Sequence, residues 1–510
     1  MKGLVWSAAC SAAMFVGCAS VAGAADIDSL VPKAPVATNG PPSPATCTSI
    51  PDFFLTACQL SWYGVRFYGT IDAGFGHQTH GAPFDPNFVT GASYFLQKMN
   101  RTPMWGLAPN GLSQSNIGVQ IKEPLSPGWS FVAQLEAGFD PYSLHLANSA
   151  ESVFANAGVP VNQQTTNGDA SRAGQFYNSV GFLGISSDSF GTLTAFRQNS
   201  LTLDGVLAYD PMAGSYAFSP IGFSGTVAGG GDTENSRYST AVKYRVAIGD
   251  FRVAALWQFG GYGLNNGSNG AFGAELGGDF RVGLGTLSVD AIGNYNKDAV
   301  NLTLSGAPTN AAGVPIGTML PQTVTATLSD NTNVMVLAKY TVEKLKLYAG
   351  YEWMQFAPPS DPFTVAGTGF TTVVGDFVCL DCGTATAGTN INSTAYSASA
   401  GFKDKVLQVF WAGARYSATD TVDMVGAYYH YGQNNFATGA ANLAACNVSS
   451  SNKNFCAGTM DAVSAMVDWR FAPKWDTYIG TFYSSFNGGL ANGYLARNNL
   501  ATTAGIRFRF

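Results

Sequence analysis

The sequence predicts an all-β protein: a transmembrane antiparallel β-barrel of about sixteen strands, with long extracellular loops and short periplasmic turns. Three observations lead to this prediction. Only 11% of the 510 residues are charged, while 13% are aromatic and 60 residues are glycine; soluble domains average about 25% charged residues. Apolar and polar side chains alternate along one run after another. Short turns and long polar stretches separate these runs in alternation, as in barrels that cross membranes.

The alternation indicates strands rather than helices. In the run 129–139 the odd positions are aromatic or apolar, while the even positions include Glu136 and other polar side chains. The runs 251–259, 345–353 and 463–471 repeat this pattern, with charged residues among the alternate positions. A helix does not separate its side chains with a period of two residues. A strand with one face on lipid and the other on water does.

Counting such runs gives about sixteen strands, an even number that suits a transmembrane barrel. The runs begin near residues 62, 112, 128, 175, 190, 235, 250, 271, 285, 330, 344, 406, 420, 459, 475 and 500. The stretch Thr394–Phe402 also alternates weakly, and we assign it to a loop. This assignment decides between sixteen and seventeen strands. Among the long loops, the third covers 200–234.

The N-terminal residues predict export. Residues 1–24 have the pattern of a signal peptide: Lys2, a short apolar run and a small-residue cleavage site. A lipoprotein cut at Cys18 is the alternative, and its upstream residues fit less well. Residues 25–61 are rich in Pro, Ala and Thr, which predicts an extended periplasmic leader rather than a folded domain. The barrel domain is then 62–510.

Several other classes of protein find little support in the sequence. After the signal peptide no apolar stretch approaches the roughly 20 residues of a membrane-spanning helix, so a membrane crossing requires a closed barrel. The net charge of -6 without a basic stripe argues against nucleic-acid binding. The glycines at 229–231 lack the residues that complete a phosphate-binding loop. His77 and His80 have no acidic cluster beside them, so we predict neither a metal nor a cofactor.

The cysteines predict disulfides in the loops. Of 8 cysteines, Cys10 and Cys18 leave with the signal peptide. The others form three close pairs, Cys47/Cys58, Cys379/Cys382 and Cys446/Cys456. Exported proteins meet an oxidising compartment, where such pairs form disulfides. A zinc site at Cys379-x-x-Cys382 would need a second pair of ligands, and none is evident.

Four short motifs and the last residue together follow one family pattern. They are Tyr68–Gly74, Phe131–Phe139, Phe190–Gln198 and Ala208–Pro211, followed by the terminal Phe510. In this order they resemble the first strand, the third strand, the strand before the constriction loop and that loop itself in the general trimeric porins of Gram-negative bacteria. The resemblance runs from about Tyr68 to Phe510, which is nearly all of the mature chain. The chain departs from the family in Asn116, where relatives often carry a basic residue, in its longer loops and in its leader.

The resemblance implies an outer-membrane channel for passive diffusion of small hydrophilic solutes and ions, surrounded by outer-membrane lipid. It also implies a homotrimer whose terminal Phe510 is recognised by the assembly machinery. A sixteen-stranded barrel is wide enough for an aqueous channel, and the loop 200–234 would fold inward to narrow it. Acids on this loop would face basic residues on the wall and create a transverse field. The candidate constriction residues are Arg197, Arg66, Arg237, Asp204, Asp210, Asp232, Glu234 and Glu136.

Three alternatives remain open at this point. A substrate-specific channel with a saturable site fits the long loops and the aromatic content. A barrel plugged by its own loops would be structural or adhesive. An outer-membrane enzyme would need a nucleophile or paired acids beside a base. With only 4 His, no Ser/His/Asp arrangement can be read from the spacing, and we therefore predict no enzymatic activity.

Overall fold

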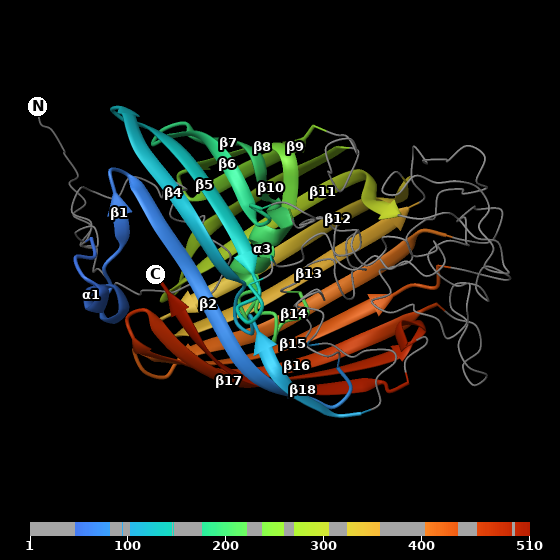
Figure 1. Cartoon of the computed structure of the whole chain (residues 1–510). Coiled ribbons are helices and arrows are strands. Elements are labelled where there is room, and N and C mark those ends of the chain that lie inside the picture. The colour runs from blue at the N-terminus through green and yellow to red at the C-terminus, as the bar shows by residue number, and fades with distance from the viewer. Residues whose placement is uncertain are drawn as a thin grey trace, which may run out of the picture.

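The computed structural model describes residues 46–81, 94, 102–144, 146, 176–221, 237–259, 270–304, 324–357, 403–436, 456–491 and 495–510. Within these residues the chain is almost entirely β-structure (Figure 1). The strands are β1 (Leu60–Trp62), β2 (Val65–Gln78), β3 (Met104–Pro109), β4 (Ser115–Ser126), β5 (Trp129–Phe139), β6 (Val180–Ser187), β7 (Gly191–Asn199), β8 (Arg237–Ile248), β9 (Phe251–Gln258), β10 (Gly270–Val282), β11 (Gly285–Leu304), β12 (Val324–Val342), β13 (Leu345–Ala357), β14 (Lys405–Ser417), β15 (Val422–Gln433), β16 (Gly458–Ala472), β17 (Trp475–Gly488) and β18 (Asn498–Arg509). The helical elements are α1 (Ile50–Leu55), α3 (Leu201–Tyr209) and the short η7 (Gly489–Ala491).

The strands form one closed antiparallel barrel. From β4 to β18 each strand pairs with its neighbour in the sequence, and β18 pairs with β2 to close the ring. β3 and β4 share one position beside β2: β3 pairs with the second half of β2 and β4 with its first half. The three-residue β1 also pairs with the start of β2, on the side that β18 occupies further along. The ring therefore has sixteen strand positions, as predicted. The stretch Thr394–Phe402, which decided between sixteen and seventeen, lies outside the described residues.

Most strand starts lie within about three residues of the predicted ones, and three differ more: β6 begins at Val180 rather than near 175, and the other two concern the second and tenth strands. The second strand was expected near 112, but the chain first makes β3 and only then β4, with a break of five residues at 110–114. The tenth strand was expected to begin near 330, whereas β12 begins at Val324. Two-residue turns join β8 to β9, β10 to β11, β12 to β13 and β16 to β17. The prediction of short turns at one end is confirmed.

Side chains alternate between the two surfaces of the barrel. On β2, Phe67, Ile71 and Phe75 are exposed on the outer surface, while Asp72 and Gln78 are buried on the inner one. The other strands repeat this arrangement, so the outer surface is largely apolar and the inner one largely polar. This distribution suits a wall between lipid and a lumen. No helix among the described residues has the length and hydropathy needed to span a membrane.

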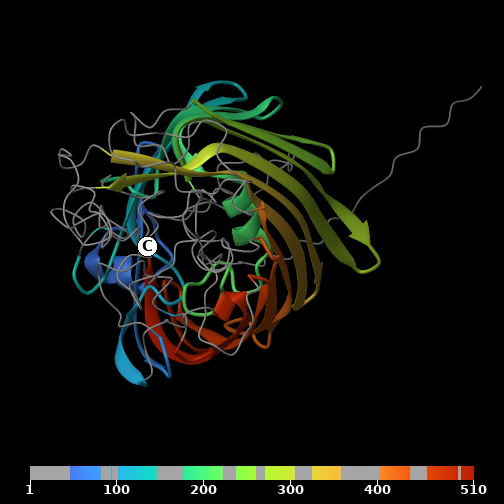
Figure 2. The same cartoon turned by 90° about the vertical axis from the view of Figure 1, so that its right-hand side faces the viewer.

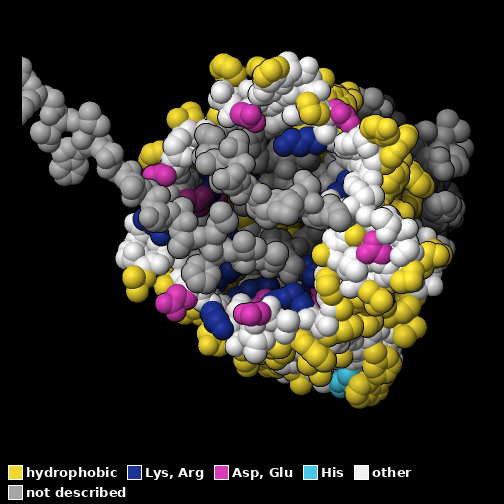
Figure 3. Space-filling model, turned by 90° about the vertical axis from the view of Figure 1, so that its left-hand side faces the viewer, with side chains coloured by type: hydrophobic (Ala, Val, Ile, Leu, Met, Phe, Trp, Pro, Cys, Tyr) yellow, Lys and Arg dark blue, Asp and Glu magenta, His cyan; other side chains and the backbone are white. Residues whose placement is uncertain are grey.

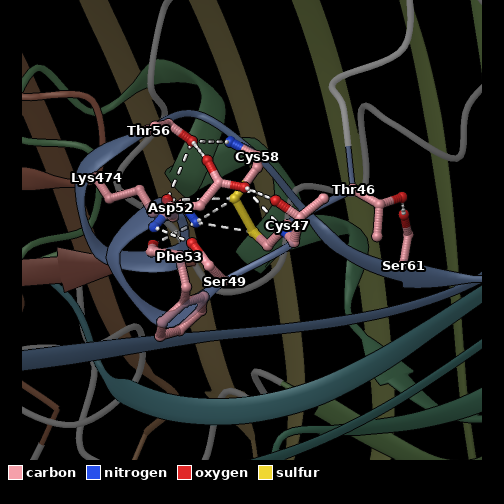
Figure 4. The surroundings of a disulfide bond; sticks show 10 residues. Thr46, Cys47, Ser49, Asp52, Phe53, Thr56, Cys58, Ser61 and Lys474 are labelled. Carbon is pink, nitrogen blue, oxygen red and sulfur yellow. Dashed lines mark hydrogen bonds between the residues drawn. A yellow bond between two sulfur atoms is a disulfide. The ribbon is translucent and has the colours of Figure 1, made fainter.

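The expected leader, 25–61, differs from the prediction in its last part, because residues 46–61 are folded. The helix α1 has a serine N-cap and a proline in its first turn, both of which favour a helix start. A disulfide joins Cys47 to Cys58 around this helix (Figure 4). The overall composition of the leader does not indicate this short helix, because only its capping residues mark it in the sequence. Residues 1–45 lie outside the described residues.

The folded part of the leader lies at the seam of the barrel, where the first and last strands meet. The terminal Phe510 exchanges two backbone hydrogen bonds with Gly69 of β2, at 3.0 and 3.1 Å. The neighbouring strand β1 pairs with the start of β2 and so continues the edge that β18 ends. The rings of Phe53 and Phe54 in α1 pack against Phe508, and Phe53 also contacts Phe510. We call residues 46–62 the clasp.

Candidate functional site

The candidate site is the lumen together with a segment that enters it, residues 200–221. After β7 the chain turns inward and forms α3. Ser200 is its N-cap, and its hydroxyl accepts a hydrogen bond from the amide of Leu203 at 3.0 Å. The helix ends at Tyr209, and its extended C-cap Asp210 precedes Pro211, which disfavours a helical conformation at that residue. Figure 2 shows α3 inside the ring of strands, close to the wall.

A close approach of backbone to wall positions α3. An added Cβ at Gly205 would lie 2.6 Å from Ile292 Cδ1 and 2.8 Å from Leu337 Cδ1, on β11 and β12. Only glycine lets the helix come this near without displacing those side chains. The flanking Leu201 and Val206 are buried in the same apolar cluster. The helix is thus fixed to one side of the lumen by packing.

The rest of the segment is tied to the wall by polar contacts across the barrel. These contacts join Trp411 Nε1 to the Tyr209 carbonyl at 3.1 Å, Arg415 to the Pro211 carbonyl at 3.2 Å, the Ser464 hydroxyl to the Phe218 carbonyl, and the Ala217 amide to the Gly111 carbonyl at 2.9 Å. The partners belong to β14, to β16 and to the link between β3 and β4. The segment therefore starts at β7, passes along the wall and ends near the start of β4.

Asp204 faces the wall of the barrel. Its carboxylate pairs with Lys243 at 2.9 Å and with Arg245, and Asn199 donates to it at 3.1 Å. Arg245 is also 3.7 Å from Glu275. Burial alone would raise the pKa of Asp204, but the two cations hold it below its ordinary value. Asp204 is therefore an ionised carboxylate in a charge-paired contact with β8.

Asp210, another predicted constriction residue, is bonded within the segment and to β15. It accepts hydrogen bonds from the Tyr429 hydroxyl at 2.6 Å and from the Gly214 amide at 2.8 Å, and it is only 2% exposed. Burial raises its pKa, and the Tyr429 hydrogen bond opposes this rise. The carboxylate closes the turn after α3 and joins it to β15. It holds the segment in shape rather than facing solutes.

Arg197 lies at the base of the segment, on β7. Its guanidinium donates to the Asn178 carbonyl from Nε at 3.2 Å and from Nη2 at 2.6 Å, and to the Ser239 hydroxyl at 2.9 Å. The side chain is 8% exposed. The described hydrogen bonds thus tie Arg197 to Asn178, two residues before β6, and to β8.

The remaining predicted residues are spread around the barrel. Arg66 is half-buried near the start of β2, opposite Gln120 of β4 in register. Arg237 is buried at the start of β8, opposite Asn199, which puts it beside the point where the segment leaves the wall. Glu136 is buried on β5 and accepts a hydrogen bond from the Tyr68 hydroxyl at 2.9 Å. Asp232 and Glu234 lie outside the described residues.

The predicted cysteine pairs are tested in part. Cys47–Cys58 is present, and Cys456 is also disulfide-bonded. The predicted partner Cys446 and the pair Cys379/Cys382 lie outside the described residues. Asp52 lies near both sulfurs of the first disulfide. A disulfide offers no thiolate, which is the form of cysteine that binds a metal.

Sequence reasoning missed the basic residues that actually contact the segment. Lys243 and Arg245 occupy alternate positions in the run that became β8, so their inward direction could be read from the period of two. Their partner could not, since it depends on how the segment packs. Trp411 and Tyr429 carry no sequence signal that separates them from aromatic residues of a membrane-interface girdle.

A family comparison decides the class of the protein. A family model described as Gram-negative porin matches residues 8–375. The chain belongs to the Gram-negative porin family. This porin is therefore a multi-pass barrel of the bacterial outer membrane and forms a channel through which small solutes diffuse. No match was found among curated protein sequences.

Solved structures share the porin fold at low sequence identity. The anion-selective porin from Comamonas acidovorans matches with a TM-score of 0.52 and 13% identity, covering 88% of this chain and 99% of that chain. OmpT of Vibrio cholerae gives a TM-score of 0.49 at 13% identity, over 89% and 99%. The outer membrane channel DcaP of Acinetobacter baumannii gives 0.47 at 10% identity, over 88% and 97%. The first of these likenesses shows the fold alone.

Proposed function

We propose that the segment 200–221 is the constriction of this porin and that the channel is a passive route for small hydrophilic solutes and ions. The observation that supports this is the line of contacts from Ser200 to the Ala217–Gly111 hydrogen bond. A segment held across the inside of the barrel reduces its free cross-section. Because both ends are tied to the wall, the narrowing persists without a bound ligand.

The charges along this segment support diffusion of polar solutes. Asp204 lies between Lys243 and Arg245, so opposite charges meet where the segment approaches β8. Paired fixed charges beside water give polar solutes hydrogen-bonding partners, while apolar solutes lose hydration without gain. Charges at the narrowest part of a channel also set the preference between ions.

The proposal also covers assembly. We place this chain in a homotrimer in outer-membrane lipid, and we assign to Phe510 the contact with the assembly machinery. In the folded chain Phe510 is part of the seam, bonded to Gly69 and covered by Phe53. Such a contact would precede closure of the barrel. A stepwise conductance in threes would support the trimer.

Two other functions are less well supported. A plugged barrel differs from an open channel in having little conductance. A substrate-specific channel differs in that its current saturates as the solute concentration rises. Catalysis would need a nucleophile beside a base. Among the described residues, His430 bonds to Asp461 at 2.8 Å and Tyr428 shares that carboxylate, on the outer surface of the barrel. No serine or cysteine in this part of the chain donates to the His430 ring, and we therefore propose no enzymatic activity.

Single-channel recording of the refolded porin in a planar bilayer tests the proposal. We expect stepwise openings whose conductance rises in proportion to bulk salt. The folded state is checked first by its resistance to unfolding in detergent on an unheated gel. Inserted, folded protein that gives no current would contradict the proposal and would favour a plugged barrel. Saturation of the current at low concentration of one solute would favour a specific channel.

A further inference from the structure

The half of the barrel next to the short turns carries many charged side chains on its inner surface. Most of those described form an ion pair with a neighbouring side chain of opposite charge. Arg252 on β9 pairs with Asp279 at 2.7 Å and Asp290 at 2.8 Å. On the other side, Arg470 on β16 pairs with Asp423 at 2.7 Å. The end of β18 follows the same rule, with Arg507 and Arg509 both on Asp476, at 3.0 and 2.8 Å. Figure 3 shows Lys and Arg side chains inside the opening at this end, with Asp and Glu among them.

Three neighbouring strands between these regions carry cations without acidic partners on the same strands. Nearest the turns, the register-matched residues 336–342, 345–351 and 410–416 of β12, β13 and β14 carry Lys339, Lys346 and Arg415. These residues include no Asp or Glu; the next acid on these strands, Glu352 of β13, accepts a hydrogen bond from Asn333 at 2.9 Å. All three cations alternate in phase with inward residues: Lys339 with Leu337, Lys346 with Tyr348, and Arg415 with Trp411. The wall here has three fixed positive charges and no acid of its own.

Lys346 and Arg415 are also direct neighbours across two strands. They are partners in the register of β13 and β14. Like charges directly opposite each other on one face of a sheet are destabilising. Two cations in this arrangement repel each other unless an anion lies between them or near them. The repulsion gives a reason to look for a mobile anion.

Among the residues that the structure describes, Asp423 is the carboxylate that forms an ion pair with this cluster. Lys339 donates to the Ala208 carbonyl at 3.3 Å and lies 5.1 Å above the Tyr209 ring. Arg415 donates to the Pro211 carbonyl and lies 3.5 Å from Asp423, the carboxylate that Arg470 already holds at 2.7 Å.

The Lys346 side chain makes no hydrogen bond or ion pair with any residue that the structure describes. Among the described residues, the nearby charges that act on Lys346 are the cations Arg415, Lys339 and Arg470 and the acid Asp423. Asp210, another acid nearby, already accepts hydrogen bonds from the Tyr429 hydroxyl and from the Gly214 amide. Of the three cations in this cluster, Lys346 is therefore the one whose charge the described residues balance least.

We propose that Lys346, Arg415 and Lys339 form a binding site for small oxyanions, such as phosphate or a carboxylate, on the lumen wall between segment 200–221 and the short turns. This inference rests on the proposed function, since the anion must reach the site through the channel. The Arg415 guanidinium offers paired donors that match an oxyanion, and Lys346 adds a point charge opposite it. The site raises the local concentration of anions and makes the porin select for them.

The first test measures ion preference. The zero-current potential is recorded in a potassium chloride gradient for the wild type, K346Q, K346E and K346R. Lys344 in the adjacent turn is exposed, and K344E is the matched control for the same change of charge. We expect the wild type to prefer chloride, K346R to keep this preference, K346Q to weaken it several-fold and K346E to remove it. K344E should resemble the wild type.

The second test uses inorganic phosphate as the probe. Phosphate added at neutral pH should reduce the chloride current of the wild type in a saturable way. K346Q should raise the half-blocking concentration several-fold, and K344Q should leave it unchanged. Equal blocking of wild type and K346Q, or an unchanged zero-current potential in K346E, would overturn the site. A wild type without any conductance would instead overturn the proposed function, and the two failures are thus distinguishable.

Discussion

Lys474, in the turn between β16 and β17, donates a hydrogen bond to the Phe53 carbonyl of α1 at 2.8 Å. Its ammonium also lies 4.6 Å above the Phe53 ring, and both sulfurs of the Cys47–Cys58 disulfide are 3.7 Å away (Figure 4). Burial lowers the pKa of Lys474, and the carboxylate of Asp52 opposes this. One side chain thus joins the clasp to a turn that lies more than four hundred residues later in the chain.

Replacing Lys474 with Met should release the clasp while leaving the barrel folded. The change removes one hydrogen bond, about 1 kcal/mol, and a cation–π contact of about 0.5–1 kcal/mol. Chymotrypsin should then cleave after Phe53 or Phe54 several-fold faster than in the wild type. Lys344→Met, at an exposed turn lysine, is the control and should cleave at the wild-type rate. Identical rates in K474M and wild type would show that Lys474 does not hold the clasp.

Reduction of the Cys47–Cys58 disulfide should have a similar local effect. The bond closes a loop of sequence separation 11, for which chain entropy predicts a stabilisation of about 3 kcal/mol. We expect C47S/C58S to lose protection of α1 from protease but to keep the heat resistance of the barrel on gels. The double serine variant in reductant is the control, because reductant should change nothing further in it. A barrel that unfolds together with the clasp would contradict a purely local role.

The strands could be predicted from the sequence because one physical constraint acts at every position. Lipid outside and water inside impose a period of two, which Phe67, Ile71 and Phe75 show on β2. The inward segment was predicted as a loop, although Ser200 and Pro211 already mark the two ends of a helix. The period of two does not apply there, so the helix needed its own capping signals.

The partners within the lumen could not be predicted. Asp210 and Asp204 are both acids of the segment, yet one closes a turn on Tyr429 and the other pairs with Lys243. The difference depends on how α3 packs against β11 and β12. The alternation in the sequence indicates that Lys243 points inward, but its partner depends on how α3 packs and cannot be read from the sequence. The same limit hid the unbalanced charge at Lys346.

Enlarging Gly205 should disturb the constriction without unfolding the barrel. Gly205→Leu forces α3 away from Ile292 and Leu337, and overpacking of this kind costs about 1–3 kcal/mol. The single-channel current should become noisier, because the segment loses its fixed position. Gly293→Leu on β11 is the control, since the nearest atom to an added Cβ there is 4.0 Å away. Steady openings of wild-type size in G205L would show that the channel does not depend on the place of α3.

Protonating Asp204 should free Lys243 and Arg245. Since its pKa in the folded chain lies below the ordinary 3.8, folding favours the carboxylate. Its contribution is therefore fully present above pH 3.8 and is lost as the pH falls through the lowered value. We expect the current noise to rise in that acid range in the wild type.

The variant Asp204→Asn should show the raised current noise already at neutral pH. Lowering the pH should then cause no further rise in noise through this residue. The variant should also shift the zero-current potential toward anions, because one negative charge is lost beside two cations. The sign is opposite to that expected for K346E, so a general effect of mutation on the channel cannot produce both shifts. Asp188→Asn, in the turn between β6 and β7, is the control. An equal shift in D188N would mean that Asp204 does not act at the constriction.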